Sequence, residues 1–355
     1  MDTAWRPLFV FVGGFLGAGK TTLILSASRL LAGRGKRVAM ITNDQDSALV
    51  DTRLAAAHQL AAREVAGGCF CCRFSDLLHE AAALRDYAPD IIFAEPVGSC
   101  IDLSATILQP LKRLYENDYQ LAPLTVLIDP HTAMRAQRGE LDADLRYLYR
   151  HQLAEADLVC VTKKDLYSEP PALLVPIDVA VSGVSGEGVA EWIQEVLSGQ
   201  RVVGARLLEV DYDRYAEAEA ALAWLNLHAT VRISPPESPA LLCGPLLDRL
   251  AEELRKRGTF IAHLKVFDQS PSGWLKASIT GNSTPKPEGD LLAEPSEQHE
   301  VAINLRALAD PDEMRELVTS VLKEIDGDIE IRHLRAFRPA RPEPEHRFSR
   351  VSASV

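Results

Sequence analysis

The sequence predicts an α/β fold with a mostly parallel sheet, followed by a smaller α+β carboxyl-terminal domain. Three observations predict it. Short apolar, β-rich runs alternate with helix-like segments up to residue 200, a glycine-rich loop follows the first run, and strands gather together after residue 229. A chain of 355 residues is long enough for about two domains, each with its own core.

The first domain is expected over residues 1–204, ending where Gly199 and Gly204 flank polar residues. Alternation of strands and helices favours a parallel sheet covered on both faces. Its predicted strands are Leu8–Val12, Val38–Thr42, Ile91–Ala94, Leu124–Ile128, Leu158–Thr162 and Ile177–Val181. Its predicted helices include Thr21–Ala32, Ser75–Leu84, Leu145–Ala154 and Val189–Leu197.

The second domain is expected over residues 205–337, with strands in succession that favour an antiparallel sheet. Its predicted helices are Arg214–Trp224, Pro239–Arg257 and Pro311–Ile325. Its predicted strands are Ala229–Ser234, Phe260–Asp268, Gly273–Thr280 and Glu300–Ala307. Residues 282–298 are expected to be a mobile hairpin loop, and residues 338–355 a disordered tail without an apolar period.

Composition narrows the function classes. The net charge of −12 and a pI of about 5.3 argue against general nucleic-acid binding, which needs a basic surface. The longest apolar run, residues 8–19, is too short for a membrane helix and lacks a basic leader. We therefore expect a cytoplasmic protein with neither nucleic-acid nor membrane partners.

Gly14-x-x-x-x-Gly19-Lys20-Thr21 matches the pattern of a P-loop, with an apolar strand before it and a helix after it. Glycines allow backbone amides to turn toward a phosphate. Lys20 is expected to neutralise the β- and γ-phosphates, and Thr21 to ligate Mg²⁺. The first domain is thus predicted to be a P-loop NTPase domain. Its nucleotide-binding residues are expected to be Gly14, Gly17, Ala18, Gly19, Lys20, Thr21 and Thr22.

Polar residues follow several predicted strands, at the edge where α/β sheets bind ligands. Glu95, after Ile91–Ala94, suits the acid that holds Mg²⁺ directly or through water. Asp44, after the second strand, is a further candidate for Mg²⁺ or for positioning the attacking water. Lys20, Asp44 and Glu95 are therefore the expected catalytic residues. Asp129 is as readily a helix cap as a functional acid.

Thr162-Lys163-Lys164-Asp165 follows the fifth strand of this domain and bears on the choice of base. A carboxylate at Asp165 can accept from both N1–H and the 2-amino group of guanine, a pair that adenine lacks. The Lys163 stem can pack along the base. GTP is therefore preferred to ATP.

Cys69, Cys71 and Cys72 crowd into Gly67–Cys72 (GGCFCC). Thiols so close together can converge on one soft cation such as Zn²⁺ or Cu⁺, with a fourth ligand from elsewhere or from water. Buried structural thiols or reversible thiol oxidation are the alternatives. Cys100, Cys160 and Cys243 are interpreted as core or incidental residues.

The segments GGFLGAGKTT, GGCFCC, Glu95-x-x-Gly98 and TKKD occur in an order that resembles the CobW/HypB/UreG family of P-loop GTPases, specifically its CobW-like metallochaperone branch. The resemblance covers about residues 8–200. It implies a GTPase whose Cys-x-Cys-Cys motif binds Zn²⁺ or Co²⁺ and whose nucleotide state governs metal delivery to a client protein. It also implies that Lys20, Thr21 and Glu95 handle phosphate and Mg²⁺.

The resemblance further implies that guanine is contacted by Thr162, Lys163, Asp165 and Ser182, the last within a loop running from Val181 to Gly188. The chain departs from the branch in three ways. Thr42-Asn43-Asp44-Gln45 stands where the branch usually carries Asn-Glu-Phe-Gly after its second strand, Thr162 stands where Asn is commoner, and the family's His-rich metal loops are missing.

The leading hypothesis is a slow GTPase in which Mg²⁺–GTP orders the Asp44 and Cys69–Cys72 loops and hydrolysis releases them. A second hypothesis is a GTP-gated reactivation chaperone for a cobalamin-dependent or other metalloenzyme, without transfer of free metal. A small-molecule kinase is disfavoured by the TKKD segment and by the lack of an evident lid. A nucleotide-dependent homodimer is left open.

Overall fold

The computed structural model describes residues 5–46, 50–167, 172–281 and 286–351. By its internal contacts the chain forms two compact units, which are described separately. Unit 1 comprises Met1–Gln45, His58–Ala218 and Arg341–Val355, and unit 2 comprises Asp46–Ala57 and Glu219–Ala340. Each unit is therefore made of more than one stretch of chain, and the domain bounds 1–204 and 205–337 stay a prediction.

Unit 1 is built on an eight-stranded sheet with the order β3-β2-β4-β1-β6-β7-β8, and β5 pairs with β1. Every strand pair in it is parallel. Within the described residues the strands are β1 Leu8–Gly14, β2 Val38–Asn43, β3 Ala61–Val65, β4 Ile91–Glu95, β5 Gln120–Leu121, β6 Thr125–Ile128, β7 Leu158–Val161 and β8 Val179–Ala180. The α/β class predicted for this part of the chain is confirmed.

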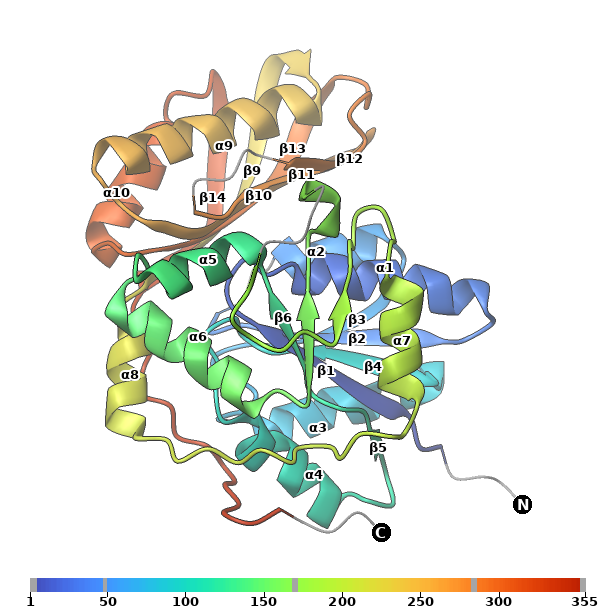
Figure 1. The fold of residues 1–355 in the computed structure, drawn as a ribbon. Helices are drawn as coiled ribbons and strands as arrows, with labels where there is room; N and C mark the ends of the chain where they lie inside the picture. Colours follow the sequence, from blue (N-terminus) through green and yellow to red (C-terminus); the bar gives the residue numbers. More distant parts are fainter. Residues whose placement is uncertain (1–4, 47–49, 168–171, 282–285, 352–355) are drawn as a thin grey trace. The chain divides into compact units, whose positions relative to one another are not determined.

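Helices lie on both sides of the sheet, as α1 and α3 do in Figure 1. The strands β1, β2 and β4 are buried along almost their whole length, as expected for a parallel sheet covered on both faces. The helices are α1 Lys20–Gly33, α3 Phe74–Ala83, α4 Gln109–Leu114, α5 Pro130–Arg138, α6 Ala143–Glu155, α7 Val189–Leu197 and α8 Tyr212–Ala220. Single turns of 3₁₀-helix at Arg85–Tyr87 and Lys164–Leu166 and of π-helix at Ser104–Leu108 complete the unit.

Unit 2 is an antiparallel sheet with the order β12-β11-β10-β13-β9-β14, which confirms the predicted α+β architecture. Its strands are β9 Ala223–Glu237, β10 Ile261–Ser270, β11 Gly273–Ile279, β12 Lys286–Gly289, β13 Ser296–Ala307 and β14 Gly327–Phe337. Its helices are α2 Val50–Ala57, α9 Pro239–Lys256 and α10 Pro311–Leu322.

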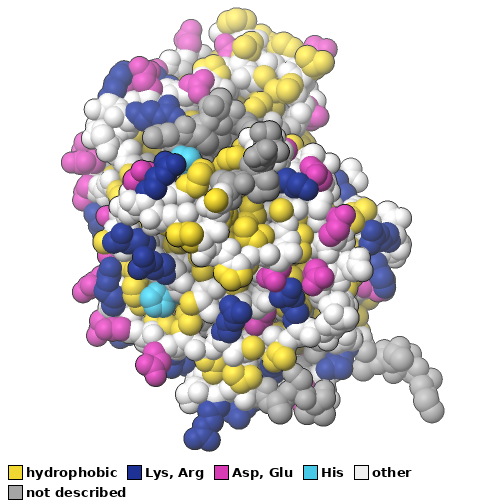
Figure 2. Space-filling model, viewed as in Figure 1, with side chains coloured by type: hydrophobic (Ala, Val, Ile, Leu, Met, Phe, Trp, Pro, Cys, Tyr) yellow, Lys and Arg dark blue, Asp and Glu magenta, His cyan; other side chains and the backbone are white. Residues whose placement is uncertain are grey.

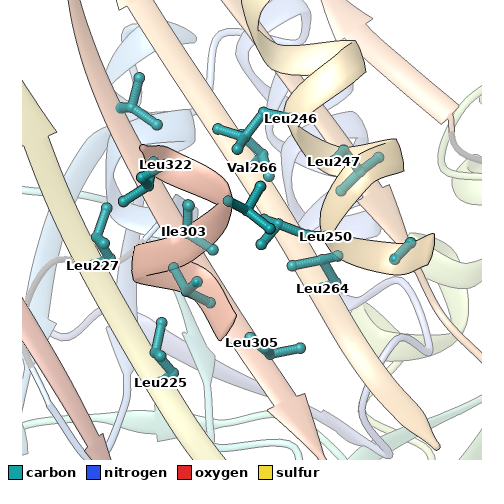
Figure 3. Packing of buried hydrophobic residues seen from close by; sticks show 14 of the residues in the cluster. Leu225, Leu227, Leu246, Leu247, Leu250, Leu264, Val266, Ile303, Leu305 and Leu322 are labelled. Atoms are coloured by element: carbon teal, nitrogen blue, oxygen red, sulfur yellow. The ribbon is translucent and has the colours of Figure 1, made fainter. Parts of the chain in front are cut away.

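One face of this sheet carries the core of unit 2. Leu246, Leu247 and Leu250 of α9 and Leu322 of α10 pack over the strand residues labelled in Figure 3, which include Leu264 and Ile303. Side chains alternate between the faces of a strand, so Lys265 and Asn304 lie on the opposite face. That second face holds α2, because Lys265 bonds to Asp51 and the Asn304 Oδ1 accepts from the Val50 N–H at 2.9 Å.

Two predicted segments of the second half differ from the structure, and one strand was not predicted. The helix expected at Arg214–Trp224 ends at Ala220, because Ala223–Glu237 pairs with both β13 and β14. Strand β14 was not predicted; its alternation of apolar and polar residues is interrupted where the register shifts between Ile331 and His333. Of the expected hairpin loop, Lys286–Gly289 is strand β12 and β13 begins at Ser296, while residues 282–285 lie outside the described residues.

No helix of the described residues is long and apolar enough to cross a membrane. On the face shown in Figure 2, Lys and Arg side chains are interspersed with Asp and Glu.

Candidate nucleotide and metal site

The predicted P-loop connects β1 to α1. Gly14 has a φ of 131°, and a Cβ there would lie 2.7 Å from the Leu127 carbonyl oxygen, so the position requires glycine. Gly17 and Gly19 continue the turn with φ angles of 77° and 93°. The buried Lys20 ammonium donates to the Gly14 carbonyl at 3.0 Å. This hydrogen bond fixes the positive charge of Lys20 at the loop in which the phosphates are expected to bind.

Thr21 and Glu95 lie together. The Thr21 hydroxyl donates to Glu95 Oε1 at 3.1 Å, and both side chains are buried. Asp44 follows the end of β2, and the register of β2 with β4 pairs Thr42 with Glu95. Three oxygen-bearing side chains therefore come from neighbouring strand ends and the start of α1, and oxygen is the donor that Mg²⁺ prefers.

The predicted base-reading segment is fastened to the P-loop. The Thr162 hydroxyl donates to the Ala18 carbonyl at 2.7 Å, which links the end of β7 to the phosphate loop. Lys163 has a left-handed φ of 59°, and its Nζ lies 3.4 Å from Asp129 Oδ2. Asp129 is also the N-cap of α5, accepting from the His131 N–H, so the helix-cap interpretation of this residue holds.

Asp165 is held by the loop after β8. The Ser182 hydroxyl donates to Asp165 Oδ1 at 2.6 Å and accepts from the Ser185 N–H at 3.0 Å. Gly183 packs against the first turn of α1, where a Cβ would lie 3.0 Å from backbone atoms of Thr22 and Leu23. The two loops that the sequence assigns to guanine thus meet each other and the phosphate-binding helix.

The three clustered thiols converge. Cys69 Sγ lies 2.8 Å from Cys71 Sγ and 3.2 Å from Cys72 Sγ, and the remaining pair is 3.7 Å apart. Tetrahedral zinc with Zn–S bonds of about 2.3 Å puts its sulfurs about 3.8 Å apart. A small outward movement of Cys69 would therefore fit the cluster to a soft ion.

The thiols differ in acidity. Hydrogen bonds from Cys100, then Cys71 and Cys72, lower the pKa of the buried Cys69 well below its ordinary value. Donating to Cys69 instead raises the pKa of both Cys71 and Cys72. The cluster thus favours one thiolate on Cys69 that its neighbours stabilise, and thiolate is the form that binds metal.

Asn43 holds the cysteine loop, a role that the sequence analysis did not assign. Its amide nitrogen donates to the carbonyls of Val65 and Gly68 at 3.0 and 2.7 Å, and its oxygen accepts from the Phe70 N–H at 2.7 Å. The sequence feature that could have indicated this role is the position of Asn43, directly before Asp44 at the end of a predicted strand.

The carboxyl-terminal tail lies along the same loop. The Glu343 N–H donates to Cys72 Sγ at 3.1 Å, and the Glu345 N–H donates to the Cys71 carbonyl at 2.9 Å. Further on, Arg347 Nε donates to the buried Asp102 at 2.7 Å. Residues 341–351 therefore follow a hydrogen-bonded path, whereas the sequence predicted disorder. Backbone and charged contacts hold this segment, and such contacts leave no apolar period in the sequence. Residues 352–355 of that tail lie outside the described residues.

Comparison with known proteins agrees with this geometry. A family model for the CobW/HypB/UreG nucleotide-binding domain matches residues 8–182. The zinc chaperone YeiR of Escherichia coli (strain K12) is 30% identical over 160 residues, 43% of this chain and 45% of that protein. The chain thus spans less than half the length of this relative.

The urease accessory protein UreG of Ureaplasma parvum serovar 3 is 31% identical over 159 residues, 42% of this chain and 74% of that protein. Among solved structures, HypB from Helicobacter pylori in complex with nickel is 14% identical with a TM-score of 0.41, over 55% of this chain and 87% of that chain. That structural likeness is too distant to support an argument about function.

Proposed function

The chain belongs to the CobW/HypB/UreG family, and from that premise we propose that it is a GTP-hydrolysing metallochaperone. It holds Zn²⁺ or Co²⁺ on Cys69, Cys71 and Cys72 and delivers the metal to a client metalloprotein. One observation carries the proposal: three thiols lie within 4.8 Å of one another on the loop that Asn43 fastens to the end of β2. Strand β2 is the neighbour of β4, which ends in Glu95.

The residues of the phosphate site are suited to hydrolysis by positioning. The P-loop backbone cradles the phosphates, and the Lys20 ammonium offsets the charge on the β- and γ-oxygens. Mg²⁺, when bound, neutralises charge between these phosphates. Thr21 and Glu95 offer it oxygen ligands, and Asp44 orients the attacking water. No side chain needs to form a covalent bond to phosphate.

The base site favours guanine. Asp165 is oriented by Ser182 and presents a carboxylate to the N1–H and 2-amino donors. Lys163 lies against Asp129 with its stem available to cover the base, and Thr162 ties this segment to the P-loop. The chain therefore prefers GTP to ATP.

The thiol cluster favours a soft or borderline ion, since thiolates bind Zn²⁺ and Co²⁺ far better than Mg²⁺. Its connection to the nucleotide site runs through Asn43, which bonds to the Cys loop and directly precedes Asp44, the proposed water-positioning acid. A change at the γ-phosphate on hydrolysis would move Asp44 and, through Asn43, the cysteines.

Two variants test this function separately. Lys20→Ala should abolish GTP hydrolysis and leave zinc binding without nucleotide intact. Replacing Cys69, Cys71 and Cys72 together by Ala should abolish zinc binding and leave GTP binding intact. Unchanged zinc affinity in the triple variant would refute the metal half of the proposal, and unchanged GTP turnover in Lys20→Ala would refute the enzymatic half.

A further inference from the structure

Consecutive residues of the carboxyl-terminal tail each meet a partner on unit 1. The Glu345 carboxylate accepts from the Ser75 N–H at 3.1 Å and from the Ser75 hydroxyl at 2.5 Å, in the first turn of α3. A carboxylate is favoured at that end of a helix, where unpaired N–H groups carry partial positive charge. The next residue, His346, lies edge-on to the buried Phe74, with ring centroids 5.1 Å apart. This part of unit 1 thus accepts an acidic residue followed by a ring.

The following residue, Arg347, binds to a buried acid. Its Nε donates to Asp102 Oδ2 at 2.7 Å, and the Tyr212 hydroxyl donates to the same oxygen at 2.8 Å. Asp102 is 1% exposed and has a left-handed φ of 65°, and backbone outliers of this kind gather at ligand-binding sites. A buried carboxylate that loses its cation is strongly destabilising. The position therefore requires a cationic partner, and a guanidinium fits it.

The tail does not use this acid fully. Arg347 bonds to one oxygen of Asp102, while the other, Oδ1, is buried and has no hydrogen-bond partner among the described residues. Within residues 341–351, Pro342 is the one buried residue, and the Arg347 side chain is 34% exposed. An arginine that bonded to both oxygens would bind more strongly, because bidentate pairs are the stronger ones. A tail held in this way can be displaced by a segment that binds better.

The same segment covers the most exposed thiol of the cluster. The Glu343 N–H donates to Cys72 Sγ at 3.1 Å, and the Glu345 N–H donates to the Cys71 carbonyl at 2.9 Å. Cys69 and Cys71 are each 1% exposed, whereas Cys72 is half-buried. A protein that takes metal from the cluster has to reach Cys72 first. It therefore has to occupy the path that the tail now follows.

We propose that the surface of unit 1 beneath residues 343–348 is the docking site for the client, and that the chain's own tail blocks this site until an extended segment of the client replaces it. The inference rests on the metal-delivery part of the proposed function. The contacts specify the segment: an acidic side chain for the start of α3, a ring for Phe74 and, two residues after the acid, an arginine for Asp102. A tethered tail competes at an effective concentration on the order of millimolar, so Cys72 stays covered until a client that binds better is present.

Peptide binding to the full-length, zinc-free chain tests the docking site independently of metal. The probe is a fluorescent peptide with the sequence of residues 341–351. Because the wild-type tail fills the site, the peptide should bind the Arg347→Ala chain at least about tenfold more tightly than the wild type. Arg350→Ala, an exposed change in the same tail, should bind it as weakly as the wild type does. A peptide with Ala at the position of Arg347 should bind none of these chains.

Glu345→Ala provides a second variant at an exposed side chain. It removes the contact with α3 and leaves Arg347 and Asp102 in place, so it should raise peptide affinity less than Arg347→Ala does. Equally weak peptide binding to the wild type and to both tail variants would overturn the docking site. Wild-type dimers that the peptide dissociates would assign the surface to the tail of a second copy, and would overturn its assignment to a client.

Zinc transfer from the loaded chain to a chelator measures the blocking role of the tail. Arg347→Ala should lose zinc at least about tenfold faster than the wild type, and the peptide added in trans should restore the slow rate. Equal rates in both chains would overturn this role of the tail and leave the proposed function standing. A wild-type chain that binds no zinc would refute the proposed function, and with it the assignment of the surface to a client.

Discussion

The side-chain oxygen of Asn43 accepts a hydrogen bond from the backbone N–H of Phe70 at 2.7 Å. This contact joins the end of β2 to the middle of the Cys69–Cys72 loop. Asp44, the proposed water-positioning acid, is the next residue, so it and the residue that holds the thiol loop are neighbours in the chain. Coupling between nucleotide and metal therefore requires no long pathway through the fold.

Replacement of Asn43 by Ala should loosen the cysteine loop. The buried Phe70 N–H and the carbonyls of Val65 and Gly68 would each lose a partner, at a cost of about 1–3 kcal/mol in the free energy of unfolding. Zinc affinity, measured by competition with a chelator, should fall. Ser28→Ala removes a different buried hydrogen-bonding group of this unit, a hydroxyl that donates to the Ile24 carbonyl, and should leave zinc affinity unchanged. Equal zinc affinities in both variants would contradict the proposed role of Asn43.

The Asp165→Asn variant should change the base preference. An amide can donate to the 2-oxo group of xanthine but clashes with the 2-amino group of guanine. GTP affinity should therefore fall by about 1–3 kcal/mol, the usual discrimination of a bidentate base contact, while XTP affinity rises. Nucleotide titration checks both. Glu187→Gln, an exposed change at the partner of Lys164, serves as the control. Retained GTP preference in Asp165→Asn would place the base elsewhere.

The Arg347→Ala variant should release the tail. Asp102 is 1% exposed and accepts from Arg347 and from the Tyr212 hydroxyl at 2.8 Å, and burial raises its pKa. Loss of a buried ion-pair partner costs several kcal/mol of stability. Because the Arg347 guanidinium is about a third exposed, we expect the free energy of unfolding of this variant to fall by about 1–3 kcal/mol.

The same variant should expose Cys72, because the tail covers it through the Glu343 N–H. Alkylation of Cys72 should be faster in Arg347→Ala than in the wild type, while Arg350→Ala, at an exposed position of the same tail, should behave as wild type. An unchanged alkylation rate together with unchanged stability would show that the tail does not depend on this ion pair.

Unit 2 should lose stability as the pH rises. His299 and Asp268 form a fully buried pair, with His299 Nδ1 2.9 Å from Asp268 Oδ2. Burial lowers the pKa of His299, but its hydrogen bonds to Asp268 and to backbone outweigh this and raise the pKa above 6.5. A raised histidine pKa stabilises the fold fully below the unfolded value of about 6.5, and this contribution disappears as the pH rises through the folded pKa.

Urea unfolding of wild type and His299→Gln at several pH values measures this contribution. The difference in the free energy of unfolding between the wild type and His299→Gln should be largest near pH 6 and shrink toward pH 9. The exposed His79→Gln should show no such trend. If this difference instead grew with pH, the expected loss of the His299 contribution at high pH would be contradicted.

Sequence alone predicts those parts of the site that are local in the chain. The P-loop is a contiguous pattern between a strand and a helix, and Cys69, Cys71 and Cys72 are neighbours in one turn. Both are therefore visible without knowledge of the strand order. The hydrogen bond between Asn43 and Phe70 is not, because it requires the loop after β3 to lie beside the end of β2.

Two further features leave little trace in the sequence. The tail is held by backbone N–H groups and by Arg347, so it shows no apolar period, although it lies on the cysteine loop. Helix α2 belongs to unit 2 through the pairs Asp51–Lys265 and Val50–Asn304, whose members lie more than two hundred residues apart. Neither the tail nor helix α2 has a residue spacing or composition that distinguishes it from a solvated surface segment.

The central claim is that the nucleotide state controls the metal site. Anaerobic titration of the full chain with Zn²⁺ and Co²⁺, with and without a non-hydrolysable GTP analogue and Mg²⁺, measures it most directly. The account predicts metal affinities that differ between the two states by about 5- to 150-fold, the usual range of coupling between sites. Equal affinities with and without bound nucleotide would contradict it.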